Sequence, residues 1–188
     1  MKIIWFFHVA FMSVRAKEIV DEMLNDMQDS WLLDAIDELH ICVIWWTIKT
    51  NNPKIIVHDY WNNFKQYEFP TLELLQEKCK NDPNMKVFYL HTKWASKPFN
   101  TGDIEWRRDM TKCVVKRYKE CINLLDEYDT VWTRMLLLKT FPRHYSWNFR
   151  WANATYINTL HSFEWRKSDR YVAETRVCSN KEVLYYNM

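Results

Sequence analysis

Lys86-Val-Phe-Tyr-Leu-His-Thr-Lys93 is the stretch from which the fold of this chain is predicted. It follows a turn-like segment, Asn81-Asp-Pro-Asn84, and its four apolar or aromatic residues run directly into three polar ones. A short apolar run bounded by turn residues is typical of a buried strand. His91, Thr92 and Lys93 would then lie at the carboxyl end of that strand, where open α/β sheets bind their ligands.

Strand and helix patterns alternate on both sides of this stretch. Helix 15–28 has its apolar residues on one stripe, Pro70 suits the start of a helix, and Asp103 and Asn153 suit helix caps. This alternation predicts a largely parallel sheet with helices on both faces, a three-layer α/β fold, and we expect residues 1–188 to form one domain. The further strands are predicted at 3–9, 38–46, 54–57, 129–138 and 182–186, and the further helices at 71–80, 104–127, 154–160 and 171–177.

The composition narrows the classes of protein to consider. A net charge of +2, from 26 Lys plus Arg against 24 Asp plus Glu, gives no overall case for binding nucleic acid. The five cysteines are widely spread without a C-x-x-C pair, which favours reduced thiols and a cytoplasmic location. No segment has the roughly 18 consecutive apolar residues of a transmembrane helix. We read residues 3–12 as a buried strand rather than a signal peptide, because His8 interrupts the apolar run.

Glycine and tryptophan usage is anomalous. The chain has one glycine and 11 tryptophans, whereas ordinary usage of about 7% predicts roughly 13 glycines. Several tryptophans stand at turn positions, where a bulky residue does not readily adopt the positive φ that such turns often need. The sequence therefore describes a destabilised relative of a natural protein. The positions concerned are Trp31, Trp45, Trp46, Trp61, Trp94 and Trp147.

The predicted strand ends supply the first group of candidate site residues. An imidazole, a hydroxyl and an ammonium at 91–93 suit a phosphate or a sugar hydroxyl, although an ordinary solvated strand end would look the same. Arg107 or Arg108, near the start of a predicted helix, favours an anion, and at most one of the two would face the site. The other strand ends expected at this edge are Phe7-His8, Trp45 to Thr47 and His58-Asp59.

Two later segments supply further candidates. In 144–153, aromatic rings offer faces for sugars while Ser146, Asn148 and Asn153 offer donors and acceptors; an aromatic core segment is the equal alternative. In 168–174, Asp169 and Glu174 supply carboxylates, of which one could act as general base on an acceptor hydroxyl. Solvated helix charges would explain these two residues equally simply.

Other templates are missing. The chain has no G-x-x-x-x-G-K-[ST], G-x-G-x-x-G, G-x-S-x-G or H-E-x-x-H motif. His58-Asp59 offers two metal ligands, which are too few, and the Asp-x-Asp pair of many metal-dependent sugar transferases is absent. No metal ligand is therefore assigned. A divalent cation, Mn²⁺ or Mg²⁺, is the one cofactor that stays open.

Several motifs, in order over nearly the whole chain, carry a resemblance to a known family. They are Ile4-Trp-Phe-Phe-His-Val-Ala10, Ile36-Asp-Glu-Leu-His-Ile-Cys-Val43, 87–93 with Ala95-Ser96, Trp106-Arg-Arg-Asp-Met110, Tyr145-Ser-Trp-Asn-Phe-Arg-Trp-Ala-Asn153, Tyr156-Ile157 and 170–174. Together they resemble a family of small glycosyltransferase-like proteins from bacterial surface-polysaccharide gene clusters and large viruses. Where that family reads His-Thr-Lys-Gly, this chain has Trp94 in place of the glycine. Where it reads Ser-Gly-Asn-Phe-Trp-Trp-Ala, this chain has Trp147 and Arg150 in place of the glycine and the first tryptophan. These departures put the activity of this chain in question more than the resemblance.

The resemblance implies a Rossmann-like, GT-A-like fold and transfer of a sugar from a nucleotide-sugar donor to a glycan or lipid-linked acceptor. Glu174 would be the base if the reaction inverts configuration, with His91 and Asp169 as further catalytic candidates. The substrate-binding candidates are Phe7, His8, Val9, Thr92, Lys93, Arg107, Ser146, Asn148, Trp151, Asn153 and Arg170.

Two alternatives stay open from the sequence. A catalytically silent nucleotide- or carbohydrate-binding domain is favoured by the missing Asp-x-Asp and by the bulky tryptophans. Phosphoester chemistry dependent on His91 and Lys93 is the third hypothesis.

Overall fold

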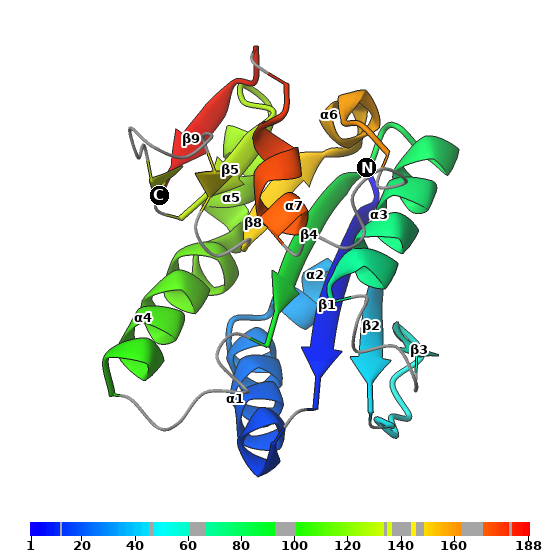
Figure 1. Ribbon diagram of the computed structural model, residues 1–188, viewed down its shortest axis with the longest axis vertical. Coiled ribbons are helices and arrows are strands. Elements are labelled where there is room, and N and C mark those ends of the chain that lie inside the picture. Colours follow the sequence, from blue (N-terminus) through cyan, green and yellow to red (C-terminus); the bar gives the residue numbers. More distant parts are fainter. Residues whose placement is uncertain are drawn as a thin grey trace.

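A single large sheet organises the chain (Figure 1). A computed structural model describes residues 1–11, 13–45, 47–60, 67–92, 101–133, 135–136, 144–145, 149–162, 171–180 and 182–188. The sheet runs in the order β3 (Ile55–Asp59), β2 (Glu38–Ile44), β1 (Ile3–Ala10), β4 (Lys86–His91), β8 (Arg150–Asn153), β5 (Thr130–Trp132), β9 (Tyr185–Asn187). Only β8 among these strands is antiparallel to its neighbours.

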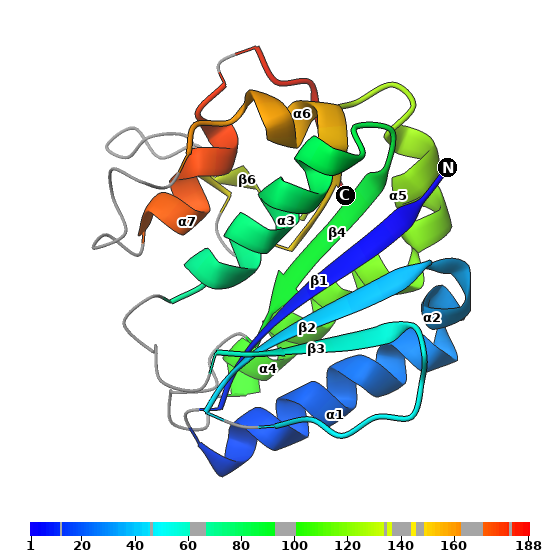
Figure 2. The same cartoon turned by 90° about the vertical axis from the view of Figure 1, so that its right-hand side faces the viewer.

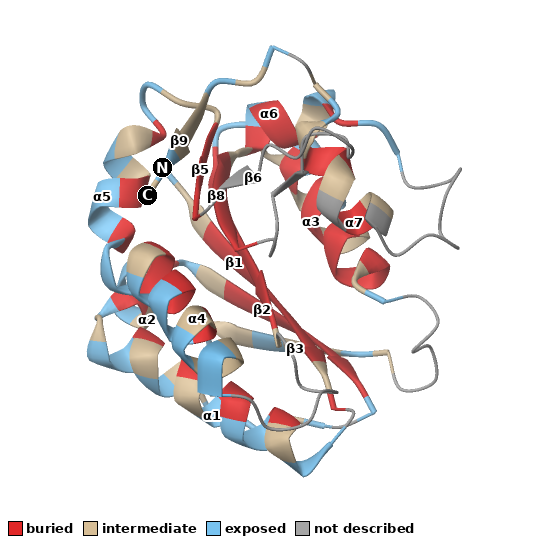
Figure 3. Ribbon diagram, turned by 60° about the vertical axis from the view of Figure 1, so that its left-hand side comes forward, coloured by how far each residue is buried: buried red, intermediate tan, exposed pale blue. Residues whose placement is uncertain are grey.

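Helices cover both faces of the sheet (Figures 2 and 3). Strand β1 alternates between the two: Trp5, Phe7 and Val9 pack on one face, and Ile4 and Phe6 on the other. The predicted fold class, a three-layer, Rossmann-like α/β fold with a mainly parallel sheet, is confirmed. One face packs against α1 (Val14–Asp29), α2 (Leu32–Ala35), α4 (Thr101–Thr111), the π-helix η2 (Lys112–Lys116) and α5 (Tyr118–Leu124); the other packs against α3 (Phe69–Asn81), α6 (Ala154–Thr159), α7 (Tyr171–Thr175) and the 3-10 helix η3 (Arg176–Cys178).

The order of the strands reverses between β1 and β4. From β1 the chain passes through α1 and α2 to β2 and then to β3, all on one side of β1. Helix α3, which has Pro70 in its first turn, carries the chain back to β4 on the other side of β1. Such a reversal leaves a crevice outside the carboxyl ends of the two strands, where open α/β sheets bind ligands.

The predicted helix 104–127 is not continuous. It begins at Thr101, changes to a π-helix at Lys112 and resumes as α5. Asp103 lies in the first turn of α4 rather than at its cap. The apolar spacing could not reveal the π segment, because one widened turn changes the helical register by a single residue.

The C-terminal half differs most from expectation. Within its described residues, the segment predicted as strand 129–138 forms β5 and a short strand, β6 (Met135–Leu136), which pairs with β7 (His144–Tyr145). Strand β8 lies in a segment without clear periodicity, because it is buried on both faces and therefore lacks alternation. The predicted strand 182–186 is shorter, beginning three residues later and ending one residue later, as β9.

Two of the tryptophans at predicted turns have the backbone conformation that favours glycine. Trp31 has φ 64° and Trp45 has φ 69°, both in the left-handed region. Trp31 is 70% exposed, so packing of its indole contributes little to offset this conformation. The prediction of positive φ is confirmed at these two positions. Trp46, Trp61, Trp94 and Trp147 lie outside the described residues.

Candidate functional site

The carboxyl ends of β1 and β4 bring two histidines together at the reversal of strand order. His8 and His91 are cross-strand partners, and both side chains point to the face covered by α3. Each is about 95% buried. Two imidazoles at this crevice were predicted from the strand ends, and the register places them side by side.

Residues at the start of α3 complete a buried polar cluster with these histidines. Glu68, just before the helix, accepts a hydrogen bond from His91 Nδ1 at 2.5 Å and another from the Tyr89 hydroxyl at 2.7 Å. Thr71 Oγ1 lies 2.8 Å from His8 Nδ1. The amino end of a helix stabilises a carboxylate, so α3 itself supports the negative charge of Glu68.

The environment fixes the protonation of this cluster. Burial alone would raise the pKa of Glu68, but His91 and the hydrogen bonds from His91 and Tyr89 hold that pKa well below its ordinary value. Burial together with the adjacent carboxylate raises the pKa of Tyr89 well above its ordinary value. Burial lowers the pKa of His8 to about 4, so His8 is neutral at pH 7. The cluster therefore carries a fixed anion next to a neutral imidazole.

His91 is the residue of this cluster with an uncommitted nitrogen. Its Nδ1 faces the Glu68 carboxylate, which fixes the orientation of the ring, while Nε2 is buried and has no hydrogen-bond partner among the described residues. Phe149 packs edge-on against the ring at 5.6 Å between centroids. A histidine oriented by a carboxylate presents its second nitrogen as a proton acceptor or hydrogen-bonding group.

A buried cation adjoins the cluster. Arg150, from the antiparallel strand β8, is opposite Tyr89 in the sheet and lies 5.0 Å from the centre of its ring. It also lies 5.4 Å from the ring of Trp132. Burial lowers its pKa. Arg150 thus packs as a third planar group between two aromatic rings.

Several predicted substrate-binding side chains belong to the core instead. Phe7, Val9 and Trp151 are fully buried, and Trp151 stacks on Phe88 and donates its indole hydrogen to the carbonyl of Val114 at 2.8 Å. Thr92 accepts a hydrogen bond from the Ala10 amide through its hydroxyl. For the segment around Trp151, the alternative of an aromatic core is correct, because this ring lies in the core between the sheet and η2.

Two other predicted residues lie away from the crevice. Arg107 is buried and donates to Glu22 of α1 at 2.8 Å, on the opposite face of the sheet from His91. Asn153 pairs with Lys86, the first residue of β4, and so lies at the amino edge of that strand. Its side-chain amide donates to the carbonyls of Leu125 and Tyr128. The structure therefore corrects the placement of both at a common site.

The remaining predictions stay predictions. Lys93, Ser146, Asn148, Asp169 and Arg170 lie outside the described residues. Glu174 belongs to α7, on the same face of the sheet as α3, although its side chain is not described. The described part of the chain holds no group of three or more His, Cys, Asp or Glu residues arranged to bind a metal ion.

Sequence reasoning missed Glu68 and Tyr89. Tyr89 lay within the predicted strand and was read only as an apolar residue. Glu68 directly precedes Phe69-Pro70, and a carboxylate just before a proline-marked helix start is a signal that could have drawn attention to it.

The fold and the cluster at the strand reversal define a Rossmann-like α/β protein with a candidate site at the carboxyl ends of β1 and β4. The chain belongs to the family described as "Domain of unknown function (DUF8361)", which it matches over residues 8–183. No curated protein matches it. It is similar to the "Crystal structure of 4-diphosphocytidyl-2C-methyl-D-erythritol synthase", with a TM-score of 0.44 and 11% identity over 84% of this chain and 77% of that chain. None of the described helices is long and apolar enough to cross a membrane.

Proposed function

We propose that this chain is a glycosyltransferase that moves a sugar from a nucleotide-sugar donor to a glycan or lipid-linked acceptor, as the motif resemblance implies. The observation that carries the proposal is the imidazole of His91, held by Glu68 at the strand reversal with Nε2 uncommitted among the described residues. In an open α/β sheet, this crevice is where a nucleotide-linked ligand is expected. His91 Nε2 would hydrogen-bond the diphosphate or a hydroxyl of the donor sugar.

Glu174 is the proposed base. In an inverting transfer, a carboxylate takes the proton of the acceptor hydroxyl. The oxygen of that hydroxyl attacks the anomeric carbon, and the nucleoside diphosphate departs with the electrons of the broken bond. Lys93, Ser146 and Asn148 remain the proposed donor contacts, and Arg107 leaves that set because of its ion pair with Glu22.

The test uses variants that separate the two nitrogens of His91. In His91→Asn, the side-chain amide can still donate to Glu68, so the buried carboxylate keeps its partner, but nothing replaces Nε2. We expect donor hydrolysis and sugar transfer to fall about 100-fold with little change in Tm. His161→Gln, at an exposed histidine, is the matched control. Unchanged turnover by His91→Asn would contradict the proposal.

A catalytically silent binding domain is the second candidate. The absence of an Asp-x-Asp pair and the tryptophans at turn positions favour it. Thermal shifts with nucleotide sugars, with and without manganese, followed by a hydrolysis assay, distinguish the two: a shift without turnover supports the silent domain. Turnover of a phosphate monoester that His91→Asn abolishes would instead support phosphoester chemistry.

A further inference from the structure

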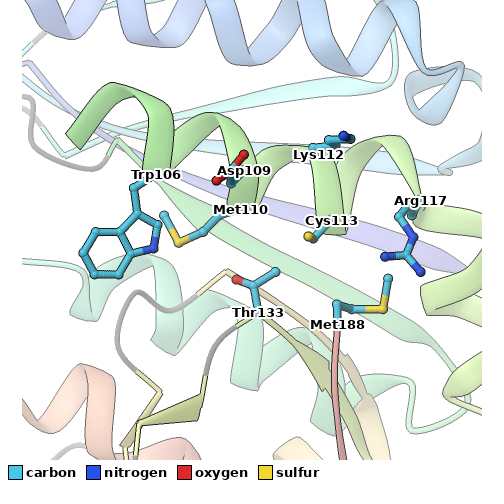
Figure 4. A pocket seen from close by; sticks show the side chains of 8 residues that line it. All are labelled: Trp106, Asp109, Met110, Lys112, Cys113, Arg117, Thr133 and Met188. Atoms are coloured by element: carbon cyan, nitrogen blue, oxygen red, sulfur yellow. The ribbon is translucent and has the colours of Figure 1, made fainter. Parts of the chain in front are cut away.

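A cavity of about 350 Å³ lies on the other face of the sheet, between the helical segment α4–η2 and the ends of β5 and β9 (Figure 4). Its size is at the lower end of the range of small-molecule sites and suits one or two sugar rings. We call this cavity the α4 trough. Its lining includes Trp106, Met110, Cys113, Thr133 and Met188, and its charged members are one anion, Asp109, and two cations, Lys112 and Arg117.

The trough lies at the same edge of the sheet as His91. Strand β5 is parallel to β4, because both are antiparallel to β8 between them. Thr133 directly follows β5, just as His91 ends β4. Two strand spacings separate these strand ends, which is about 10 Å. A molecule in the trough therefore approaches the candidate site along this edge, from the face opposite α3.

One end of the trough combines an aromatic ring with an unsatisfied hydroxyl. Figure 4 shows Trp106 and Met110 together at this end, with Thr133 facing them from the strand side. Thr133 is 4% exposed, and its hydroxyl has no hydrogen-bond partner among the described residues. A buried hydroxyl without a partner is costly, so a ligand that bonds to it gains affinity. A sugar has both an apolar face for the ring and a hydroxyl for Thr133.

The other end of the trough carries a cation. Figure 4 shows Arg117 beside Met188 at this end. The guanidinium pairs with Glu120 one turn along, at 2.6 and 2.8 Å, but both side chains are more than 40% exposed. Such an exposed pair is weak, so Arg117 can exchange it for a carboxylate or phosphate held against the trough.

The backbone between the two ends is irregular. The π-helix η2 begins at Lys112 and contains Cys113, which lies in the middle of the lining. Single π-helical turns occur frequently at functional sites. The irregular turn thus lies over the cavity rather than elsewhere along the helix.

We infer that the α4 trough binds an acidic saccharide, with a sugar ring against Trp106, a sugar hydroxyl on Thr133 and a carboxylate or phosphate on Arg117. This inference rests on the proposed function, in which the saccharide is the acceptor. It narrows the acceptor to a glycan with an anionic group on or next to the sugar that binds.

The experiment compares three disaccharides of the same linkage by isothermal titration: an uncharged one, one with a glucuronic acid and one with a 6-phosphate. We expect the two acidic disaccharides to bind about tenfold more tightly than the uncharged one. The acidic disaccharide that binds more tightly identifies the preferred anion as a carboxylate or a phosphate. Arg117→Gln should remove this preference, whereas Lys119→Gln, which also removes a cation but lies in α5 outside the lining of the trough, should preserve it. Equal binding of all three disaccharides, or no binding, would overturn the inference.

A second variant tests the position of the ligand. Thr133→Val removes a hydroxyl that has no partner among the described residues, so it leaves no protein group unpaired and should fold. It should weaken binding of all three disaccharides about fivefold or more, and unchanged binding would contradict the assigned site. Donor hydrolysis in the same variants keeps the two proposals apart. A variant that loses disaccharide binding but still hydrolyses the donor supports the proposed saccharide site in the trough. If the protein binds the disaccharides but hydrolyses no donor, only the proposal of a glycosyltransferase is contradicted.

Discussion

The left-handed backbone of Trp31 predicts which of two variants at this position, alanine or glycine, is the more stable. Trp31 joins α1 to α2 with φ 64° and ψ 13°, and its side chain is 70% exposed. A residue with a Cβ atom in this left-handed region costs about 1–2 kcal/mol relative to ordinary backbone. Glycine carries no such cost, and this chain has only one glycine.

The informative comparison is Trp31→Ala with Trp31→Gly. Both variants remove the indole, so the loss of its partial burial cancels in the difference. Alanine keeps the left-handed cost of about 1–2 kcal/mol, while glycine loses about 0.5–1 kcal/mol through the greater freedom of its unfolded chain. We therefore expect Trp31→Gly to be more stable than Trp31→Ala by about 0.5–1 kcal/mol.

The neighbouring Ser30 is the control, because its φ of −84° and ψ of −4° lie in the right-handed region. There the order should reverse, with Ser30→Ala more stable than Ser30→Gly by about 0.5–1 kcal/mol. Urea unfolding at equal m-values measures all four free energies. Trp45, with φ 69°, should repeat the result for Trp31. Alanine as stable as glycine at both tryptophans would refute the reasoning.

Three further predictions follow from the buried polar groups and the proposed base. Burial lowers the pKa of His8 and of His40 from 6.5 to about 4, so their contribution to stability is intact above pH 6.5 and is lost as the pH falls towards 4. The free energy of unfolding should therefore drop by about 3 kcal/mol per histidine over that pH range. His40→Gln should remove part of this drop. Asn153→Ala leaves two carbonyls without their donor and should cost about 1–3 kcal/mol in urea unfolding, with Asn153→Asp no better because it has no N–H to donate. Glu174→Gln should abolish sugar transfer while Tm is retained, and full turnover by this variant would remove Glu174 from the mechanism.

Local sequence patterns were sufficient for the amino-terminal half of the fold. The apolar runs of β1, β2 and β4 and the apolar stripe of α1 are each complete within one short segment of the chain, so composition and spacing identify them. The chemistry at the ends of β1 and β4 was also evident, because His8 and His91 directly follow the apolar residues of their strands.

The C-terminal half depends on contacts that no local pattern records. Strand β8 pairs with β4 along one edge and with β5 along the other, and the helical layers cover its two faces. This central position buries Trp151 in the core and carries Asn153 to the amino edge of β4. Arg107 likewise faces Glu22, a residue 85 positions away in the chain. The sequence does not reveal such a contact, because the partner of Arg107 is fixed only when α1 and α4 pack together.

The sequence by itself determined the alternation of strands and helices, the placement of His91 at a strand end and the positive φ at Trp31 and Trp45, because each depends on a few neighbouring residues. Only the tertiary structure decided that Glu68 orients His91 and that the α4 trough opens at the same edge of the sheet. Both depend on distances between segments far apart in the chain, and these distances are set by the packing of the whole sheet.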